Sequence, residues 1–342
     1  MLFSPLKINN LEIKNRISMA PMCMYCAKSD GISNNFHFLH YSTRAMGGAG
    51  LITMEATGVE ECGKITDTCL GIYDDSHIPG LSSIVKSVHE NGAKISIQLA
   101  HAGRKSMTQH TNCIYGPTNI PYDENSRLPL AMTEDDINNV VTSFKNAADR
   151  ARQANFDMVQ IHAAHGYLLS SFLSPLSNTR TDSYGGSLQN RTKFLLRVVE
   201  AVKKTFDGPL SIRINGYDHV PGGITPEEAA AVINIVKDYG VNIVDISSGA
   251  VVPSSIKHDI SQQIKYAEII KQQTNLPVIA GGNLTDPINM DDIIKSNKAD
   301  MVFLGRELLR NPFFPLHSAQ ILDQPVDWPY SKNSLKSMFF RY

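Results

Sequence analysis

Short apolar runs rich in β-forming residues alternate with longer amphipathic patterns along almost the whole chain. The apolar runs occupy residues 16–22, 51–56, 94–100, 158–161, 210–214, 242–246, 277–280 and 301–304. Helical patterns lie between them at residues 35–46, 81–90, 135–153, 191–206, 226–239, 262–273 and 286–296. Parallel strands are apolar on both faces and need crossover helices, so this alternation predicts a single (β/α)8 TIM barrel.

An open, doubly wound sheet is the alternative that this alternation leaves open. The first strand is not followed by the GxGxxG turn of a dinucleotide-binding unit, which favours the closed barrel. The 342 residues suit one barrel with insertions, and we expect a single domain over residues 1–342. Residues 7–13 alternate around an Asn-Asn pair and predict an N-terminal hairpin. Residues 103–127 are rich in Thr, Asn, Pro and Tyr and predict an extended loop over the barrel mouth.

Two of the predicted helices carry start signals. Thr225 precedes Pro226 and two glutamates, which places a threonine at the N-cap and a proline at the first helical position, and Gly240 is expected to end that helix. Thr133, followed by three acidic residues, is a weaker capping box.

Charge and cysteine content limit the kind of partner and compartment. The formal net charge is -1, which provides no basic excess for nucleic acid or an anionic membrane. No run approaches the roughly 18 apolar residues of a membrane span, and the N-terminus does not resemble a signal peptide. Five cysteines, an odd number, fit a reducing cytoplasm. We therefore expect a cytoplasmic protein that acts on small molecules.

Residues 156–167 read FDMVQIHAAHGY, an apolar strand followed directly by His162, His165 and Tyr167. Titratable side chains at the end of a parallel strand are typical of an active site, because ligands bind at the carboxyl ends of barrel strands. The segment is therefore predicted to form the floor of the site. The alternative for any one of these residues is a hydrogen-bonded core histidine or a tyrosine that only packs.

If the barrel is closed, the residues at all eight strand ends share one mouth. They are Cys23, Tyr25, Glu55, Ala56, Gln98, His101, Lys105, His162, His165, Tyr167, Arg213, Ser247, Ser248, Gly281, Gly282, Gly305 and Arg306. Few of them are carboxylates, which disfavours a divalent metal centre, and His162 with His165 lacks a third zinc ligand. A metal-dependent hydrolase remains the rival enzyme class.

Glycines follow the seventh and eighth strands, in Gly281-Gly282 and Gly305-Arg306. Backbone N–H groups can approach a phosphate at these positions in barrels of this type. Arg213 could stabilise an anionic ring on the barrel axis. Together these residues indicate a phosphorylated cofactor lying across the mouth.

The cysteines have less specific readings. Cys23-x-x-Cys26 could be half of a metal site or a redox pair, but a second CxxC is absent. Cys23 has no base beside it in the sequence, which disfavours a covalent nucleophile. For Cys26, Cys62, Cys69 and Cys113 a structural role is expected, and the sequence does not specify it.

Several separated motifs resemble those of the old yellow enzyme family of flavoproteins. They are Ala20-Pro21-Met22-Cys23-Met24-Tyr25, Gln98 to Lys105, His162-Ala163-Ala164-His165-Gly166-Tyr167, Phe172-Leu173-Ser174-Pro175, Asn178-Thr179-Arg180-Thr181-Asp182, Tyr184-Gly185-Gly186, Gly208-Pro209-Leu210 with Arg213, and Gly305-Arg306-Glu307-Leu308-Leu309. The likeness covers essentially the whole chain. It is nearest to the bacterial NADPH dehydrogenases of the thermophilic-like subgroup, which have a cysteine at the position of Cys23.

This resemblance implies a non-covalent FMN that NADPH reduces. Residues matching those around the flavin ring are Ala20, Pro21, Met22, Cys23, Ala56, Gln98 and Arg213, and those matching the phosphate site are Gly281, Gly282, Gly305 and Arg306. The reduced flavin would pass a hydride to the β-carbon of an unsaturated carbonyl or nitro compound. His162 and His165 would bind the substrate oxygen, and Tyr167 would protonate the α-carbon. Tyr25, Ala163, Ala164 and Lys105 match further substrate contacts, and the Cys23 thiol would tune the flavin potential.

The resemblance also concerns assembly and substrate range. An arginine near the C-terminus of one subunit reaches a neighbour's site in this subgroup, and Arg341, within the tail 331–342, is the matching residue, although the residue after it departs from the Gly-Trp ending of other members. A homodimer or homotetramer is therefore expected. Alkenes, quinones and nitro compounds are the expected substrates, with detoxification as the expected role. A flavin-binding protein without turnover is the non-enzymatic rival. His165 stands where many members carry asparagine.

Overall fold

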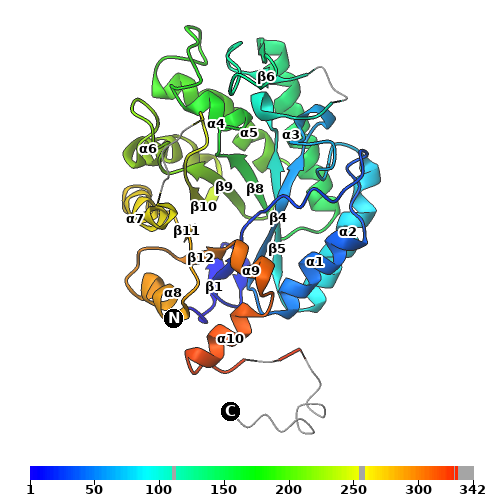
Figure 1. The fold of residues 1–342 in the computed structure, drawn as a ribbon, viewed down its shortest axis with the longest axis vertical. Coiled ribbons are helices and arrows are strands. Elements are labelled where there is room, and N and C mark those ends of the chain that lie inside the picture. Colours follow the sequence, from blue (N-terminus) through cyan, green and yellow to red (C-terminus); the bar gives the residue numbers. More distant parts are fainter. Residues whose placement is uncertain (110–112, 254–258, 327, 330–342) are drawn as a thin grey trace.

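The computed structural model describes residues 1–109, 113–253, 259–326 and 328–329 and shows a closed parallel barrel (Figure 1). Its strands are β3 (Ile17–Met19), β4 (Leu51–Gly58), β5 (Lys94–Ala100), β8 (Met158–Ala163), β9 (Leu210–Asn215), β10 (Val241–Ser247), β11 (Val278–Gly281) and β12 (Met301–Leu304). Strand β12 pairs in parallel with β3, with Val302 opposite Ile17, and this pairing closes the ring. The predicted barrel is confirmed, and the open sheet is wrong.

Helices surround the barrel in the predicted order, with α1 and α2 on one side of Figure 1 and α6, α7 and α8 on the other. The long helices are α1 (Asn35–Met46), α2 (Ile78–Glu90), α3 (Glu134–Gln153), α5 (Leu188–Lys203), α6 (Pro226–Val236), α7 (Gln263–Thr274) and α8 (Pro287–Lys295). The helices α4 (Leu168–Leu173), α9 (Arg306–Arg310) and α10 (Phe314–Ile321) were not predicted. Helices of five to eight residues show too few turns for periodicity to reveal them.

The predicted start signals of two helices are confirmed. Thr225 accepts a hydrogen bond from the Glu228 backbone N–H at 3.3 Å, and Gly240 ends the following 3-10 turn with φ +110°. Thr133 caps α3 and accepts from the Asp136 N–H, while the Asp136 carboxylate accepts from the Thr133 N–H. These bonds satisfy N–H groups that a helix start leaves unpaired.

The ends of several elements differ from the prediction. The first strand, expected over 16–22, ends at Met19, because Pro21 has no N–H to contribute to a ladder. The fifth long helix begins at Leu188 rather than at residue 191, since Ser187 accepts from the Asn190 N–H and acts as its N-cap. Neither change moves a strand to another place in the barrel.

The predicted N-terminal hairpin is present and closes the floor of the barrel. It pairs β1 (Leu6–Ile8) with β2 (Leu11–Ile13) in antiparallel register, and Asn9 in its turn has φ +51°. The apolar side chains of the hairpin pack on the residues that begin the barrel strands: Leu51, Met158, Ile243 and Met301. The opposite end of the barrel is therefore the one left for a ligand.

The predicted loop, residues 103–127, lies at that opposite end and contains some regular structure. It begins with the 3-10 turn Gly103–Lys105 and includes β6 (Tyr115–Gly116), which pairs with β7 (Leu130–Ala131). Arg104, 2 % exposed, anchors the loop through hydrogen bonds to the carbonyl oxygens of Ile120, Pro121 and Val251. A buried guanidinium that satisfies three carbonyls holds the loop against the barrel.

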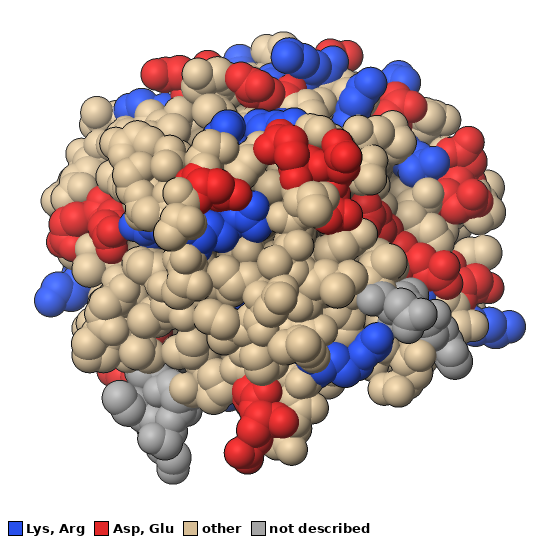
Figure 2. Space-filling model, turned by 90° about the horizontal axis from the view of Figure 1, so that it is seen from above, with Lys and Arg blue, Asp and Glu red and all other residues tan. Residues whose placement is uncertain are grey.

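Basic and acidic side chains are interspersed on the face shown in Figure 2, in keeping with the formal net charge of -1. Among the residues that the structure describes, no helix combines the length and the apolar character needed to cross a membrane.

Candidate active site

Three side chains of the segment after β8 gather at the mouth of the barrel. The ring centroid of His162 lies 5.2 Å from that of His165 and 5.0 Å from that of Tyr167, and each pair meets edge to face. The rings of His165 and Tyr167 are 6.4 Å apart. The structure thus brings together the three residues that the sequence placed in the site.

The backbone turn that makes this cluster is unusual. His165 has φ +62°, a conformation that a side chain with a Cβ rarely adopts, and Gly166 follows with φ +72°. A Cβ on Gly166 would lie 2.5 Å from the carbonyl oxygen of Ala250, so only glycine fits there. Tyr25, at the end of the first strand loop, is also left-handed with φ +54°. Such positions concentrate at functional sites.

The tautomer of His162 follows from its hydrogen bonds. Its Nδ1 accepts the backbone N–H of Ala164 at 3.3 Å, so the ring proton of the neutral imidazole lies on Nε2. His162 is buried, and its Nε2–H is therefore a donor available to a ligand.

His165 is oriented by a second chain of hydrogen bonds. Its Nε2 lies 2.6 Å from the Ser247 hydroxyl oxygen, which also accepts from the Arg213 guanidinium at 3.4 Å. Because that oxygen accepts from arginine, its own hydrogen points to the imidazole and His165 Nε2 accepts it. The ring proton then lies on Nδ1, the second available donor in the cluster.

Both imidazoles are neutral at ordinary pH. Burial, followed by the positive charges of Arg213 and Lys105, lowers the pKa of His165 to about 3. Burial, then His165 and then Arg213, lowers the pKa of His162 well below its usual value. The pair can therefore donate two hydrogen bonds to one oxygen without carrying charge itself.

Tyr167 is held as a neutral phenol. Burial, together with the neighbouring Cys23 and Tyr25, raises its pKa above the usual value. The Lys105 ammonium lies 5.2 Å from the Tyr167 ring centroid and 4.3 Å from that of Tyr122. A phenol in this setting keeps its proton until a strong base forms beside it.

Lys105 has a positioning role that the sequence did not reveal. Its Nζ donates to the carbonyl oxygens of His165 at 2.9 Å and Ala250 at 3.0 Å. Burial, then repulsion from Arg104, lowers its pKa to about 8. Lys105 therefore clamps the strained turn that carries His165 instead of standing free at the rim.

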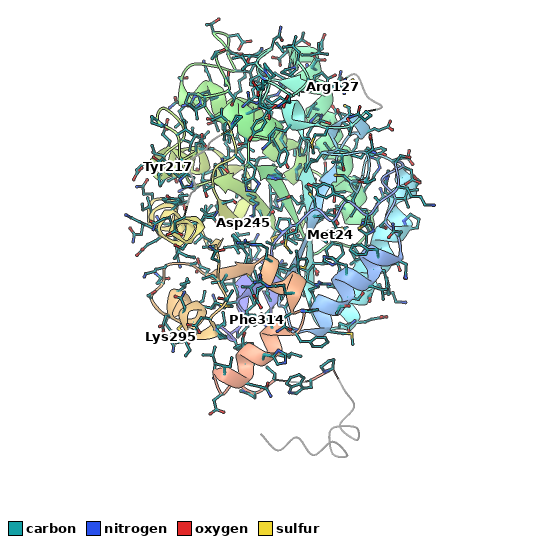
Figure 3. All side chains as sticks on the ribbon, viewed as in Figure 1. Met24, Arg127, Tyr217, Asp245, Lys295 and Phe314 are labelled. Carbon is teal, nitrogen blue, oxygen red and sulfur yellow. The ribbon has the colours of Figure 1, made fainter. Side chains whose placement is uncertain are left out.

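A buried polar network runs beneath the cluster across four strands. Gln98 donates to Gln160 at 2.7 Å, Gln160 donates to Asp245 at 3.1 Å, and Arg213 donates to the same carboxylate oxygen at 2.7 Å. Asp245 is labelled near the centre of the molecule in Figure 3. The sequence analysis missed Gln160 and Asp245 because both lie inside apolar strand runs, one residue or more before the strand ends.

Glu55 supports the opposite wall of the site. The carboxylate is fully buried and accepts from the Met24 backbone N–H at 2.9 Å and from the Tyr41 hydroxyl at 3.0 Å. Burial, opposed by these two bonds, raises the Glu55 pKa to about 7. Glu55 therefore holds the segment that contains Cys23 and Tyr25, a role that the sequence gave no means of predicting.

A cavity of about 420 Å³ opens beside this network at the ends of β11 and β12. It is lined by Arg213, Ser247, Gly282, Asn283, Gly305 and Arg306, among others. Gly282 has φ +129°, and a Cβ on Gly305 would face the cavity with Met22 Sδ, at 3.5 Å, as its nearest neighbour. Gly281 instead allows close packing, since its Cβ would lie 2.5 Å from the Phe303 ring.

This cavity suits a phosphorylated flavin. Arg213 Nε is buried and has no hydrogen-bond partner among the described residues, although the other two guanidinium nitrogens are paired. A buried, unpaired donor implies an acceptor on the missing group. The backbone of Gly282 and Gly305 and the side chain of Arg306, which bonds Asn283, are placed to hold a phosphate.

Cys23 lies next to a second cysteine. Ala56, Ala100 and Cys69 form a small buried cluster against which Cys23 and Tyr167 pack. A hydrogen bond from the Cys23 thiol, and others from Thr66, lower the pKa of Cys69 to about 6. The predicted structural role of Cys69 thus has a specific form, a hydrogen bond to the thiol at the site. Arg341 lies outside the described residues.

A closed barrel with an anion cavity, an orphaned arginine donor and paired neutral imidazoles defines a flavin-dependent oxidoreductase. The model of the NADH:flavin oxidoreductase / NADH oxidase family, whose members use FMN, matches residues 1–324. The chain belongs to this family. It is an oxidoreductase that uses FMN and a nicotinamide nucleotide, and the resemblance to the old yellow enzymes is confirmed.

Named relatives agree with this assignment. The chain is 47% identical over 327 residues to the NADPH dehydrogenase of Geobacillus sp. (strain WCH70), covering 95% of this chain and 96% of the relative. It is 46% identical over 331 residues to that of Clostridium acetobutylicum, covering 96% and 97%. The solved structure of a morphinone reductase variant with tetrahydroNAD superposes with a TM-score of 0.81 at 28% identity, covering 93% of this chain and 90% of that one.

Proposed function

We propose that the protein is an NADPH-dependent ene-reductase that reduces the carbon–carbon double bond of unsaturated carbonyl or nitro compounds. The observation that carries this proposal is the pair of neutral imidazole donors, His162 and His165, beside the buried phenol of Tyr167. The relatives named NADPH dehydrogenase support NADPH as the reductant. When bound, FMN supplies the hydride, which it receives from NADPH and passes to the substrate β-carbon.

The two histidines polarise the substrate. His162 Nε2–H and His165 Nδ1–H can both donate to one carbonyl or nitro oxygen, where negative charge develops as the β-carbon is reduced. Because both rings are buried and neutral, their donors stabilise this charge without a competing shell of water. Ala163 and Ala164 separate the two rings, and the Ala164 N–H fixes the tautomer of His162.

Tyr167 is the proposed proton donor to the α-carbon. Reduction at the β-carbon leaves an enolate-like α-carbon, which is basic enough to take a proton from a phenol. The edge-to-face packing of Tyr167 on His162, with ring centroids 5.0 Å apart, puts the phenol beside the oxygen-binding pair. Tyr25 and Lys105 line the same region, and we assign them to substrate contact and to support of the turn, respectively.

The chain holds FMN through two groups of residues. Around the ring we place Ala20, Pro21, Met22, Cys23, Ala56, Gln98 and Arg213, and at the phosphate Gly282, Gly305 and Arg306. The unpaired Arg213 Nε supports the first assignment, and the cavity beside β11 and β12 supports the second. For Gly281 the packing against Phe303 favours a structural role.

An anaerobic two-step experiment tests the proposed reaction. NADPH added to the FMN-loaded protein should bleach the flavin absorption, and 2-cyclohexenone added next should restore it and yield cyclohexanone. Colour restored by oxygen but not by any enone, maleimide or nitroalkene would leave an NADPH oxidase or a flavin-binding protein, and the ene-reductase proposal would be wrong.

Replacement of His162 tests the donor pair. His162→Ala should weaken the binding of a phenolate ligand by about tenfold to a hundredfold, as expected for one hydrogen bond to a charged acceptor. Titration of the flavin spectrum with 4-hydroxybenzaldehyde measures this affinity. His89→Ala is the matched control, since His89 contacts Asp157 outside the site.

The pH dependence of the same titration tests the charge of the pair. The pKa of His165 is lowered to about 3, so the ring stays neutral from pH 5 to 8 and affinity should follow only the ionisation of the ligand. An imidazole with an ordinary pKa would lose its positive charge as the pH rises through 6.5. A decline of phenolate affinity there, absent in His162→Ala or a His165 variant, would contradict neutral donors.

A further inference from the structure

Beneath the extended loop, and apart from the oxygen-binding cluster, three side chains of metal-binding type converge. The atoms His101 Nε2, Cys62 Sγ and a carboxylate oxygen of Glu60 all lie within 4.8 Å of one another. Glu60 and Cys62 belong to the turn that follows β4, and His101 follows β5 directly. Residues that are apart in the sequence are thus gathered by the pairing of these two strands.

The separations fit a tetrahedral ion. His101 Nε2 is 3.3 Å and Cys62 Sγ is 3.4 Å from the same oxygen of Glu60, Oε2. An ion bound at zinc-like distances to nitrogen, oxygen and sulfur requires ligand atoms about 3.3 to 3.8 Å apart. The two measured edges of the triangle therefore need little adjustment.

His101 provides an independent indication of a missing partner. The side chain is only 2 % exposed, and its Nε2 has no hydrogen-bond partner within the described part of the chain. Its Nδ1 accepts the Gly103 N–H at 3.0 Å, which places the ring proton on Nε2 when no ion is present. An ion would displace that proton, the ring would be protonated at Nδ1, and the Gly103 bond would be given up. The exchange loses one neutral hydrogen bond and gains the metal–ligand bonds.

A fourth ligand comes from the loop. The Cys113 thiol is within hydrogen-bonding reach of Cys62 and of the Tyr115 hydroxyl. With it, the set becomes two thiols, an imidazole and a carboxylate, ligands that suit zinc better than calcium or magnesium.

The surroundings hold these ligands in place. The Ser143 hydroxyl of α3 donates to Glu60 Oε1 at 2.7 Å and leaves Oε2 toward the centre of the cluster. The Gly63 carbonyl accepts the Ala102 N–H at 2.8 Å, and a Cβ on Gly63 would lie 2.9 Å from the His101 ring. This outer contact set matches the support that bound metals require.

We propose that Glu60, Cys62, His101 and Cys113 form a Zn²⁺ site that fastens the loop over the barrel mouth to the turn after β4. Two zinc-bound thiolates and one carboxylate neutralise the ion and leave a single negative charge, and binding releases the thiol protons. The proposal does not depend on the ene-reductase reaction, because none of the four side chains is assigned to it.

Metal content of the FMN-loaded protein tests this site. Protein purified with a thiol reductant, stripped with a chelator, given one equivalent of Zn²⁺ and passed through a desalting column should retain one zinc per chain. Cys62→Ser and Cys113→Ser should each lose most of it. Cys26→Ser is the matched control and should retain it, since Cys26 bonds only the Met24 carbonyl oxygen. Co²⁺ in place of Zn²⁺ should give thiolate-to-cobalt absorption that both variants lose.

Three outcomes would overturn the proposal. One is that the wild-type protein retains no zinc, and another is that both serine variants retain as much as the wild type. The third is a mass two hydrogens lower under reductant-free conditions with no zinc, which would identify a Cys62–Cys113 disulfide instead. Flavin content and circular dichroism of each variant separate loss of the ion from failure to fold.

Discussion

Tyr167→Phe should lower the rate of alkene reduction by about a hundredfold or more, as expected when a positioned proton donor is removed. Flavin reduction by NADPH should be unchanged, because that step needs no proton from Tyr167. Phenylalanine keeps the ring that packs on His162, so the site loses only the hydroxyl. Stopped-flow measurement of the two half-reactions separates these effects.

A matched control and a second substrate make this result specific. Tyr122→Phe alters the other ring that faces Lys105, at 4.3 Å, and should leave alkene reduction intact. A quinone takes up its protons on oxygen from water, so its reduction should survive in Tyr167→Phe. An equal decline of both half-reactions, or of quinone and alkene alike, would show that Tyr167 acts through structure and is not the proton donor.

Asp245→Asn should lower the free energy of unfolding by about 3–5 kcal/mol, since it leaves a buried guanidinium without its counter-charge. Asp245 and Arg213 are both almost fully buried and 2.7 Å apart. Asparagine has the same shape and can still accept from Gln160, so the loss isolates the charge. Urea unfolding of the FMN-free and the FMN-saturated protein measures it.

The same substitution on an exposed pair is the control. Asp149→Asn removes the partner of Arg152 on the surface of α3, where both side chains are at least 40% exposed, and should cost less than about 1 kcal/mol. Equal losses for the two variants would mean that the Arg213–Asp245 pair is as well solvated as a surface pair. A smaller loss in saturating FMN would indicate that the flavin compensates the unpaired Arg213.

Local patterns in the sequence were enough to predict the barrel and the principal site residues. Strand runs, helix periodicity and caps such as Thr225 depend on residues close together in the chain, and parallel strands bring their carboxyl ends to one mouth. His162, His165 and Tyr167 could therefore be placed together before any contact was known. The short helices α4, α9 and α10 were missed because they span too few turns to produce a period.

The pairings inside the site depend on contacts between distant segments, which only the tertiary structure decided. Asp245 is an acid within an apolar run, and nothing local shows that it neutralises Arg213. The tautomer of His165 depends on Ser247, a residue two strands further along the chain. Cys62 and Cys113, for which the sequence indicated only a structural role, acquire a shared environment because the loop folds back onto the turn after β4. Periodicity records which face of an element is buried, whereas charge pairing, proton positions and metal-type clusters depend on what that face meets.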